Sequence, residues 1–181
     1  MVTQGDGHSL VGISGRSGAG KSTAADVLVG SGWVRVKFAD PLKRMLRAIG
    51  LDDRHIEGDL KEKPCDLLAG QTPRHAMQTL GTEWGRQCIA PDLWTSLCRR
   101  EILLCLSQGK SVVVDDVRFE NEAEVIRALG GSVLRLNHGN NGADGHASEA
   151  GVVADMAYSN TGTRAELEGF MRYVFLMRDA G

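Results

Sequence analysis

The feature that most constrains the fold is a glycine-rich octapeptide near the N-terminus. Residues 15–22 read Gly-Arg-Ser-Gly-Ala-Gly-Lys-Ser and match the P-loop pattern at every fixed position. The apolar segment 9–14 before them predicts a short buried strand, and residues 22–28 after them predict a helix. Strand, glycine-rich loop and helix in this order indicate a phosphate-binding loop more strongly than a simple glycine-rich turn.

Each part of this motif has a chemical task. Glycines let the backbone curl so that N–H groups face phosphate oxygens, and the start of the helix adds a partial positive charge. We expect Lys21 to bridge the β- and γ-phosphates of ATP and the Ser22 hydroxyl to bind Mg²⁺. The predicted ATP-binding residues are Gly15, Arg16, Ser17, Gly18, Ala19, Gly20, Lys21, Ser22 and Thr23.

The rest of the chain alternates between strand and helix patterns. Further strands are predicted at 33–38, 111–116, 132–136 and 156–159, and helices at 42–49, 73–87, 91–106, 121–129 and 164–177. Residues 50–72 are polar and weakly periodic, with a little helix. The continuous valine run 112–114 is typical of a central parallel strand. The alternation therefore predicts a doubly wound parallel α/β sheet of about five strands, with helices on both faces.

Length and charge narrow the classes of function. The 181 residues fit one domain, 1–181, with one active site. A net charge of −2 gives no sign of a nucleic-acid polymer as partner. No apolar run approaches the roughly 20 residues that span a bilayer, and residues 1–9 lack a signal-peptide core, so we expect a cytoplasmic protein without a membrane partner. The four cysteines and five histidines lack metal-ligand spacing.

Two adjacent carboxylates follow the valine run, where a P-loop protein needs an acid to hold its metal. Strand alternation puts Asp116 and Arg118 on one side and Asp115 on the other. Asp116 is therefore expected to join Ser22 around Mg²⁺, and Arg118 to contact a phosphate. Asp115 is expected to be satisfied by a backbone donor or a salt bridge. A bend at the strand end would reverse the two carboxylates.

A P-loop alone does not separate kinases from GTPases, motors and transport ATPases. The guanine-reading Asn-Lys-x-Asp motif is missing from the sequence, and the chain is short for a mechanical ATPase. A small-molecule kinase needs arginines that clamp the acceptor phosphate. Arg74 and Gln78 share one helical face, and Gly81 and Gly85 are expected to leave room for a ligand beside it. Arg86 lies farther round an ideal helix and joins them only if the glycines bend the chain.

Five blocks of the sequence resemble the phage-type deoxynucleoside monophosphate kinases. They are the P-loop, Phe38-Ala39-Asp40-Pro41-Leu42-Lys43, the block 74–86, Asp116-Val117-Arg118-Phe119 with Asn121-Glu122, and His146-Ala147-Ser148-Glu149, with 160–163 as a weaker sixth. The resemblance implies a nucleoside-monophosphate-kinase-like fold with an acceptor-binding helical region at about 40–108 and a lid at about 137–149. It also implies ATP and a deoxynucleoside monophosphate as substrates and Mg²⁺ as cofactor. A phage or prophage origin would place the protein in the cytoplasm of a bacterial host.

The resemblance also implies roles for single residues. The expected substrate-binding residues are Asp40, Arg74, Gln78 and Glu149, and the expected catalytic cations are Lys21, Arg86 and Arg118. Similar sequences often carry an arginine just after the fourth strand, where this chain has Asn137-His138. Arg135 is a nearby substitute for that lid cation, but on an apolar strand it could equally be structural.

An ionised phosphate oxygen as nucleophile needs no protein base, so catalysis is expected to come from alignment and charge stabilisation. Two alternatives stay open at this point. One is a P-loop kinase for another small acceptor, such as dephospho-coenzyme A or a nucleoside, with Asp40 as base. The other is a nucleotide-dependent switch that is not a kinase. The sequence does not decide which bases are accepted, whether deoxyribose is required, or whether the chain forms a homodimer.

Overall fold

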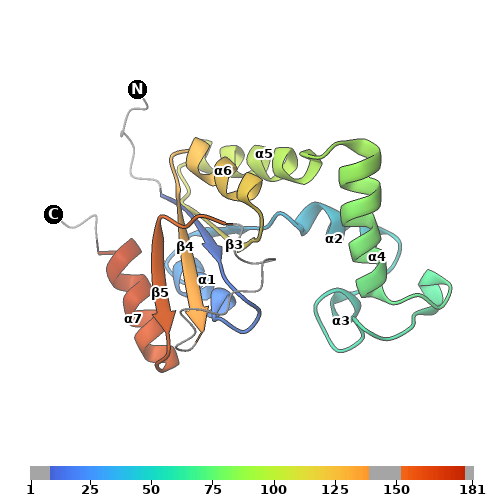
Figure 1. Ribbon diagram of the computed structural model, residues 1–181, viewed down its shortest axis with the longest axis horizontal. Coiled ribbons are helices and arrows are strands. Elements are labelled where there is room, and N and C mark those ends of the chain that lie inside the picture. The colour runs from blue at the N-terminus through green and yellow to red at the C-terminus, as the bar shows by residue number, and fades with distance from the viewer. Residues whose placement is uncertain (1–8, 139–151, 178–181) are drawn as a thin grey trace. The chain divides into compact units, whose positions relative to one another are not determined.

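A computed structural model describes residues 9–138 and 152–177 (Figure 1). The chain divides into two compact units. The first comprises residues 1–37 and 98–181 within that coverage, and the second comprises residues 38–97. The region at about 40–108, expected to bind the acceptor, overlaps the second unit.

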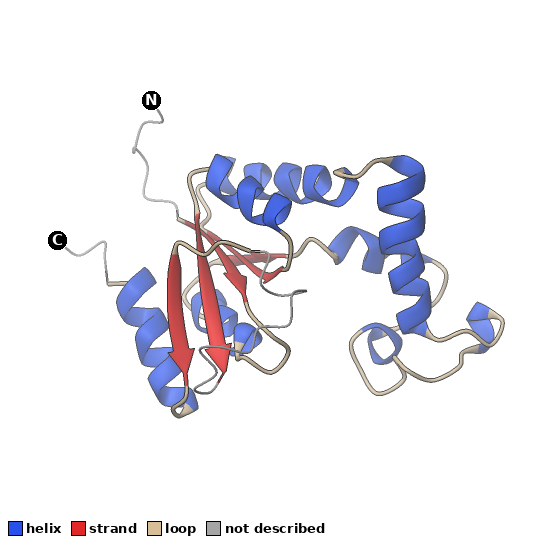
Figure 2. Ribbon diagram, viewed as in Figure 1, coloured by secondary structure: helices blue, strands red, loops and turns tan. Residues whose placement is uncertain are grey.

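The first unit is built on a sheet of five strands in the order β2-β3-β1-β4-β5, with every neighbouring pair parallel (Figure 2). Its strands are β1 (Leu10–Ser14), β2 (Val34–Val36), β3 (Val112–Val117), β4 (Ser132–His138) and β5 (Met156–Asn160). With β1 in the centre, the chain winds outward in both directions. The predicted doubly wound parallel sheet is therefore confirmed.

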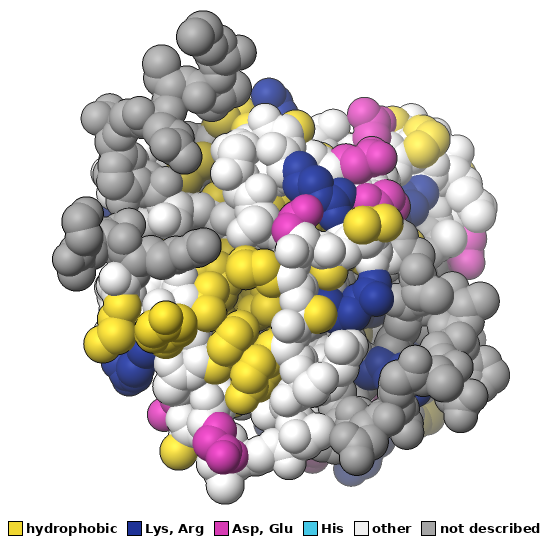
Figure 3. Space-filling view, turned by 60° about the vertical axis from the view of Figure 1, so that its left-hand side comes forward, with side chains coloured by type: hydrophobic (Ala, Val, Ile, Leu, Met, Phe, Trp, Pro, Cys, Tyr) yellow, Lys and Arg dark blue, Asp and Glu magenta, His cyan; other side chains and the backbone are white. Residues whose placement is uncertain are grey.

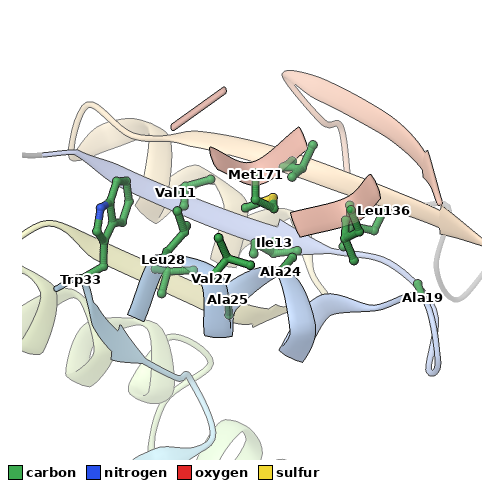
Figure 4. Close-up of a cluster of buried hydrophobic side chains, with 13 residues drawn as sticks. Val11, Ile13, Ala19, Ala24, Ala25, Val27, Leu28, Trp33, Leu136 and Met171 are labelled. Carbon is green, nitrogen blue, oxygen red and sulfur yellow. The ribbon is translucent and has the colours of Figure 1, made fainter. Parts of the chain in front are cut away.

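One face of this sheet is covered by α1 (Lys21–Val29) and α7 (Arg164–Phe175), which pack against each other. Between these helices and the sheet lies a hydrophobic cluster that includes Val11 and Ile13 of β1 and Met171 of α7, all fully buried (Figure 4). Burial of such side chains is the main source of stability for this layer.

The opposite face of the sheet is covered by α6 (Glu120–Ala128). Gly12, between the two inward-facing residues of β1, points to this side. A Cβ built on Gly12 would lie 3.0 Å from Val117 of β3 and 3.2 Å from Ile126 of α6. Helices therefore cover both faces, as predicted.

The second unit is helical and has a core of its own. Its elements are α2 (Asp40–Ala48), α3 (Asp53–Ile56), η1 (Asp66–Leu68), α4 (Pro73–Thr79), η2 (Leu80–Ile89) and the first turn of α5 (Leu93–Ser107). The buried residues of that core are Leu42, Leu46, Leu51, Ile56 and Trp94. The short α3 and η1 match the little helix predicted within residues 50–72.

The single helix predicted at 73–87 is two helices of different kinds. Thr72 caps α4 by accepting a hydrogen bond from the His75 N–H at 3.1 Å, and Pro73 occupies the first turn, where its missing N–H costs nothing. From Leu80 the chain continues as a π-helix, in which, for example, the Ala90 N–H donates to the Gly85 carbonyl five residues earlier. Such segments are rare and are found often at functional sites.

Two sequence-based expectations need correction. Gly85 does not leave room for a ligand, because its backbone packs on the Trp94 indole and a Cβ there would lie 2.6 Å from the indole Nε1. The fourth strand continues to His138, and Asn137 and His138 pair with Ser159 and Asn160 of β5. The first two residues assigned to the lid are therefore strand, and the rest of that segment, including Glu149, lies outside the described residues.

The surface carries charges of both signs. On the face shown in Figure 3, lysine and arginine side chains are interspersed with aspartate and glutamate beside a hydrophobic area. Within residues 9–138 and 152–177, none of the helices has the length and apolar character needed to cross a membrane.

Candidate active site

The phosphate loop joins the end of β1 to the start of α1 in the first unit. Gly15, Gly18 and Gly20 have φ values of 137°, 79° and 94°, in the left-handed region that side chains disfavour. A Cβ on Gly15 would collide with the Leu136 carbonyl of β4, whereas Gly18 has open space around it. A Cβ on Gly20 would lie 2.7 Å from the Asn160 Nδ2, so Gly15 and Gly20 are required both for their positive φ and because a side chain would not fit. The loop has the curl that a phosphate cradle requires.

Lys21 is the first residue of α1, and its side chain folds back over the loop. Its Nζ donates to the carbonyl oxygens of Gly15 at 2.5 Å and Arg16 at 2.7 Å. These bonds hold a positive charge beside the backbone that would surround a phosphate. The Ser22 side chain, next along the helix, is exposed and can offer its hydroxyl oxygen.

Asn160, the last residue of β5, braces the phosphate loop from behind. Its Nδ2 donates to the Ala19 carbonyl at 3.1 Å, and Ala19 itself is fully buried. When loop N–H groups turn inward toward a phosphate, the carbonyls turn outward and need donors of their own. Asn160 supplies one of them, although 141 residues separate it from Ala19.

Asp115 of β3 is buried between two cations, Arg35 of the neighbouring strand β2 and Lys37 directly after it. Its carboxylate oxygens lie 3.6 Å from the Arg35 Nε and 3.5 Å from the Lys37 Nζ, and its side chain is 2% exposed. The salt bridge expected for Asp115 is present. Arg35 also reaches α1, where it donates to Asp26 at 2.7 Å and to the Ser22 carbonyl at 3.3 Å. The acidic end of β3 therefore lies beside the first turn of the phosphate-loop helix.

A β-bulge interrupts β3 at its two carboxylates. Gly12 of β1 pairs with Val114 and Ser14 pairs with Val117, so Asp115 and Asp116 together oppose the single residue between Gly12 and Ser14. The alternation that was used to put Asp116 and Arg118 on one side of the strand does not hold across this point. Asp116 is partly exposed and remains the candidate for the magnesium shell.

Arg118 follows directly after β3 and its side chain is exposed. Its position is fixed through the backbone, because the buried Glu122 of α6 accepts the Arg118 N–H at 2.7 Å and the Phe119 N–H at 3.2 Å. Glu122 thus satisfies donors at the start of α6 and sets the turn that carries Arg118.

The second unit holds the residues expected on the acceptor side. Arg74 and Gln78 are exposed on α4, and the Arg74 guanidinium pairs with Glu62. An acceptor phosphate that bound Arg74 would have to displace the Glu62 carboxylate or share the guanidinium with it. Asp40 is the first residue of α2, where the partial positive charge of the helix N-terminus stabilises its negative charge. Arg86 is partly buried on the π-helix, and its Nη1 donates to the Gly81 carbonyl at 3.3 Å.

Comparison with known proteins places the chain in a family. A family model described as deoxynucleotide monophosphate kinase matches residues 70–168. A protein of Acanthamoeba polyphaga mimivirus, provisionally named a deoxynucleotide monophosphate kinase, is 34% identical over 163 residues, which cover 82% of this chain and 84% of that protein. This chain belongs to the deoxynucleotide monophosphate kinase family.

Two solved structures resemble the chain more distantly. The crystal structure of TT1252 from Thermus thermophilus gives a TM-score of 0.49 at 16% identity and covers 92% of this chain and 96% of that one. A dephospho-CoA kinase from Campylobacter jejuni gives 0.46 at 14% identity, with coverage of 92% and 95%. Below a TM-score of 0.5 neither likeness bears on fold or function.

Arg135, the alternative lid cation, has a structural partner in this family member. Its Nη2 donates to the Val152 carbonyl, the first described residue after position 151. The following residues are held on α6, since Glu120 accepts the Val153 N–H at 2.7 Å and Arg127 pairs with both Glu120 and Asp155. The Val153 N–H and the Arg127 guanidinium hold the pKa of Glu120 below its usual value.

Sequence reasoning did not assign roles to three residues that the structure places at these sites. Arg35 is the cation between Asp115 and α1, Asn160 braces the phosphate loop, and Trp94 packs on Gly85. The alternation of apolar and basic residues through β2 was a usable signal for Arg35. Asn160 opens the weaker sixth block of the resemblance, but nothing in that block assigns it to a carbonyl 141 residues away. Trp94 gave no signal, because it acts on the backbone of another helix.

Proposed function

We propose that this enzyme transfers the γ-phosphoryl group of ATP to a deoxynucleoside monophosphate and releases ADP and the deoxynucleoside diphosphate. The observation that carries the proposal is the phosphate loop, in which left-handed glycines curl the backbone and Lys21 lies over it. Membership of the deoxynucleotide monophosphate kinase family supports the choice of acceptor.

The first unit provides the donor side in this proposal. Loop N–H groups and the N-terminus of α1 bind the β- and γ-phosphates, and Lys21 moves from the loop carbonyls to the phosphate oxygens. An acceptor phosphate oxygen forms a bond to the γ-phosphorus while the bond to the β,γ-bridging oxygen breaks and ADP leaves. No proton has to move, so the arginines need only align and stabilise charge.

The residues beside the loop fit a magnesium ion. Mg²⁺ favours oxygen ligands and usually takes one or two from the protein, with the rest from water and phosphates. The exposed Ser22 hydroxyl lies in the first turn of α1 and provides one such oxygen. The partly exposed Asp116 carboxylate provides another, directly after Asp115, which Arg35 links to that turn. When bound, the ion would neutralise charge on the β- and γ-phosphates.

The second unit provides the acceptor side. Arg74 is proposed to exchange its partner Glu62 for the acceptor phosphate. Gln78 is proposed to lie near the base and Asp40 near the acceptor. Arg86 and Arg118 are proposed to stabilise the transferring group. A pairing with an exposed carboxylate such as Glu62 is weak, so a dianionic phosphate can displace it at little cost.

A panel of acceptors tests the proposal. ADP formation is followed with ATP and Mg²⁺ and each of the four common deoxynucleoside monophosphates, their ribonucleotide counterparts, dephospho-coenzyme A and a nucleoside. We expect at least one deoxynucleoside monophosphate to stimulate ADP release strongly. Stimulation only by a hydroxyl acceptor would favour the other kinase class, and slow ADP release that no acceptor changes would favour a nucleotide-dependent switch.

A further inference from the structure

The π-helix of the second unit changes which residues share a face with Arg74. In an α-helix each residue advances about 100°, so Arg86 would lie about 120° round from Arg74. In a π-helix the hydrogen bonds close one residue later, and each residue advances only about 80–85°. With π-helical geometry from Leu80 onward, Arg86 returns to within about 30° of Arg74, close to Gln78 as well.

The burial of Gly85 supports this geometry independently. In a continuous α-helix Gly85 would lie about 20° from Arg74, whose side chain is 49% exposed. Gly85 is instead buried, on the side of the helix that packs on Trp94. The π-helix therefore turns Gly85 inward and Arg86 toward the exposed face of Arg74.

Trp94 holds this arrangement in place. Its side chain is buried, and its Nε1 donates to the Gly81 carbonyl at 2.7 Å. The same carbonyl accepts the bond from the Arg86 guanidinium. The Trp94 ring also fills the space beside Gly85 that any side chain would occupy. One indole thus fixes both the backbone of the π-helix and the oxygen on which Arg86 rests.

We propose that Trp94 is a positioning residue for Arg86, and that the π-helix at Leu80–Ile89 presents Arg86 on the face of Arg74 and Gln78. The inference rests on the proposed function, in which Arg86 stabilises the transferring phosphoryl group. Trp94 acts only through the Gly81 carbonyl and the helix it fixes, so its loss matters for turnover only while Arg86 is present.

A double-mutant cycle on turnover tests this coupling. Trp94→Phe removes the N–H donor and keeps an aromatic ring, and we expect kcat to fall about tenfold. Arg86→Ala should lower kcat a hundredfold or more, and the double variant should be no slower than Arg86→Ala alone. Trp33→Phe is the matched control, since Trp33 is also buried but packs on Phe175 in the first unit.

Two results would overturn the inference. One is that Trp94→Phe lowers kcat by the same factor in the Arg86→Ala background as it does when Arg86 is present. The other is a Trp94→Phe variant with unchanged kcat. If Trp94→Phe does not fold, benzothienylalanine at position 94 keeps the ring shape and replaces only the N–H, so the cycle is run with it. A wild-type chain that phosphorylates no deoxynucleoside monophosphate would instead count against the proposed function.

Discussion

Neutralising Asp115 of β3 should lower the stability of the protein, whereas neutralising its neighbour Asp116 should weaken the response to Mg²⁺. Asp115→Asn removes the charge between Arg35 and Lys37, where the aspartate side chain is 2% exposed and the two cations are 26% and 25% exposed. Breaking a fully buried ion pair by removing one partner costs about 3–5 kcal/mol. Because these cations keep some water and asparagine retains a polar oxygen, we expect a loss of about 2–3 kcal/mol.

That loss corresponds to a fall in melting temperature of about 5–10 °C for a chain of this length. Asp116→Asn, one residue along, should change stability by less than about 1 kcal/mol because its side chain is partly exposed. It should instead raise the Mg²⁺ concentration needed for half-maximal turnover by about tenfold or more.

Urea unfolding and magnesium titrations of turnover on both variants separate the two roles. The reasoning is refuted if Asp115→Asn is as stable as the wild type while Asp116→Asn unfolds early. It is equally refuted if Asp115→Asn, and not Asp116→Asn, shifts the magnesium dependence.

Three further predictions concern single side chains. Lys21→Ala should leave the melting temperature nearly unchanged and lower kcat by about 10²–10³. Near-normal turnover in this variant would contradict the assignment of residues 15–22 as the phosphate-binding loop. In calorimetry Arg74→Ala should weaken acceptor binding by about 10–100-fold and leave ATP binding intact. Glu62→Gln should tighten acceptor binding by up to about fivefold, because it removes the carboxylate that competes for Arg74. Equal losses of acceptor and ATP affinity in Arg74→Ala would show that Arg74 has a structural role. Asn160→Ala should weaken ATP binding by about 5–10-fold and leave acceptor binding unchanged. The control variant Ser159→Ala, on the same strand, should bind ATP as the wild type does. Normal ATP affinity in Asn160→Ala would show that the hydrogen bond to the Ala19 carbonyl is dispensable.

Local patterns made the phosphate loop and the sheet predictable. The loop depends on glycines at fixed spacing, and β3 on a valine run that suits a strand covered on both faces. Both signals lie within a few residues of the structure they specify. The ion pair of Asp115 was predictable in kind because a buried carboxylate needs partners.

Features that depend on distant contacts were missed or, like the bend at the end of β3, raised only as an alternative. The bulge at Asp115 and Asp116 comes from the register between β1 and β3, which the sequence of β3 alone does not contain. The π-helix is contacted by Trp94 of another helix, which packs on Gly85 and donates to the Gly81 carbonyl. The glycines were correctly singled out, but the space beside Gly85 belongs to an indole and not to a ligand.

The central claim is that the γ-phosphoryl group reaches a nucleotide phosphate and not water. Phosphorus NMR of the chain with ATP, Mg²⁺ and the best acceptor of the panel follows both outcomes in one sample. The account predicts equal growth of ADP and deoxynucleoside diphosphate signals, with little orthophosphate, and growth of both that is about 10²–10³ times slower in Lys21→Ala. Orthophosphate that accumulates with ADP while the deoxynucleoside monophosphate signal stays constant would contradict it.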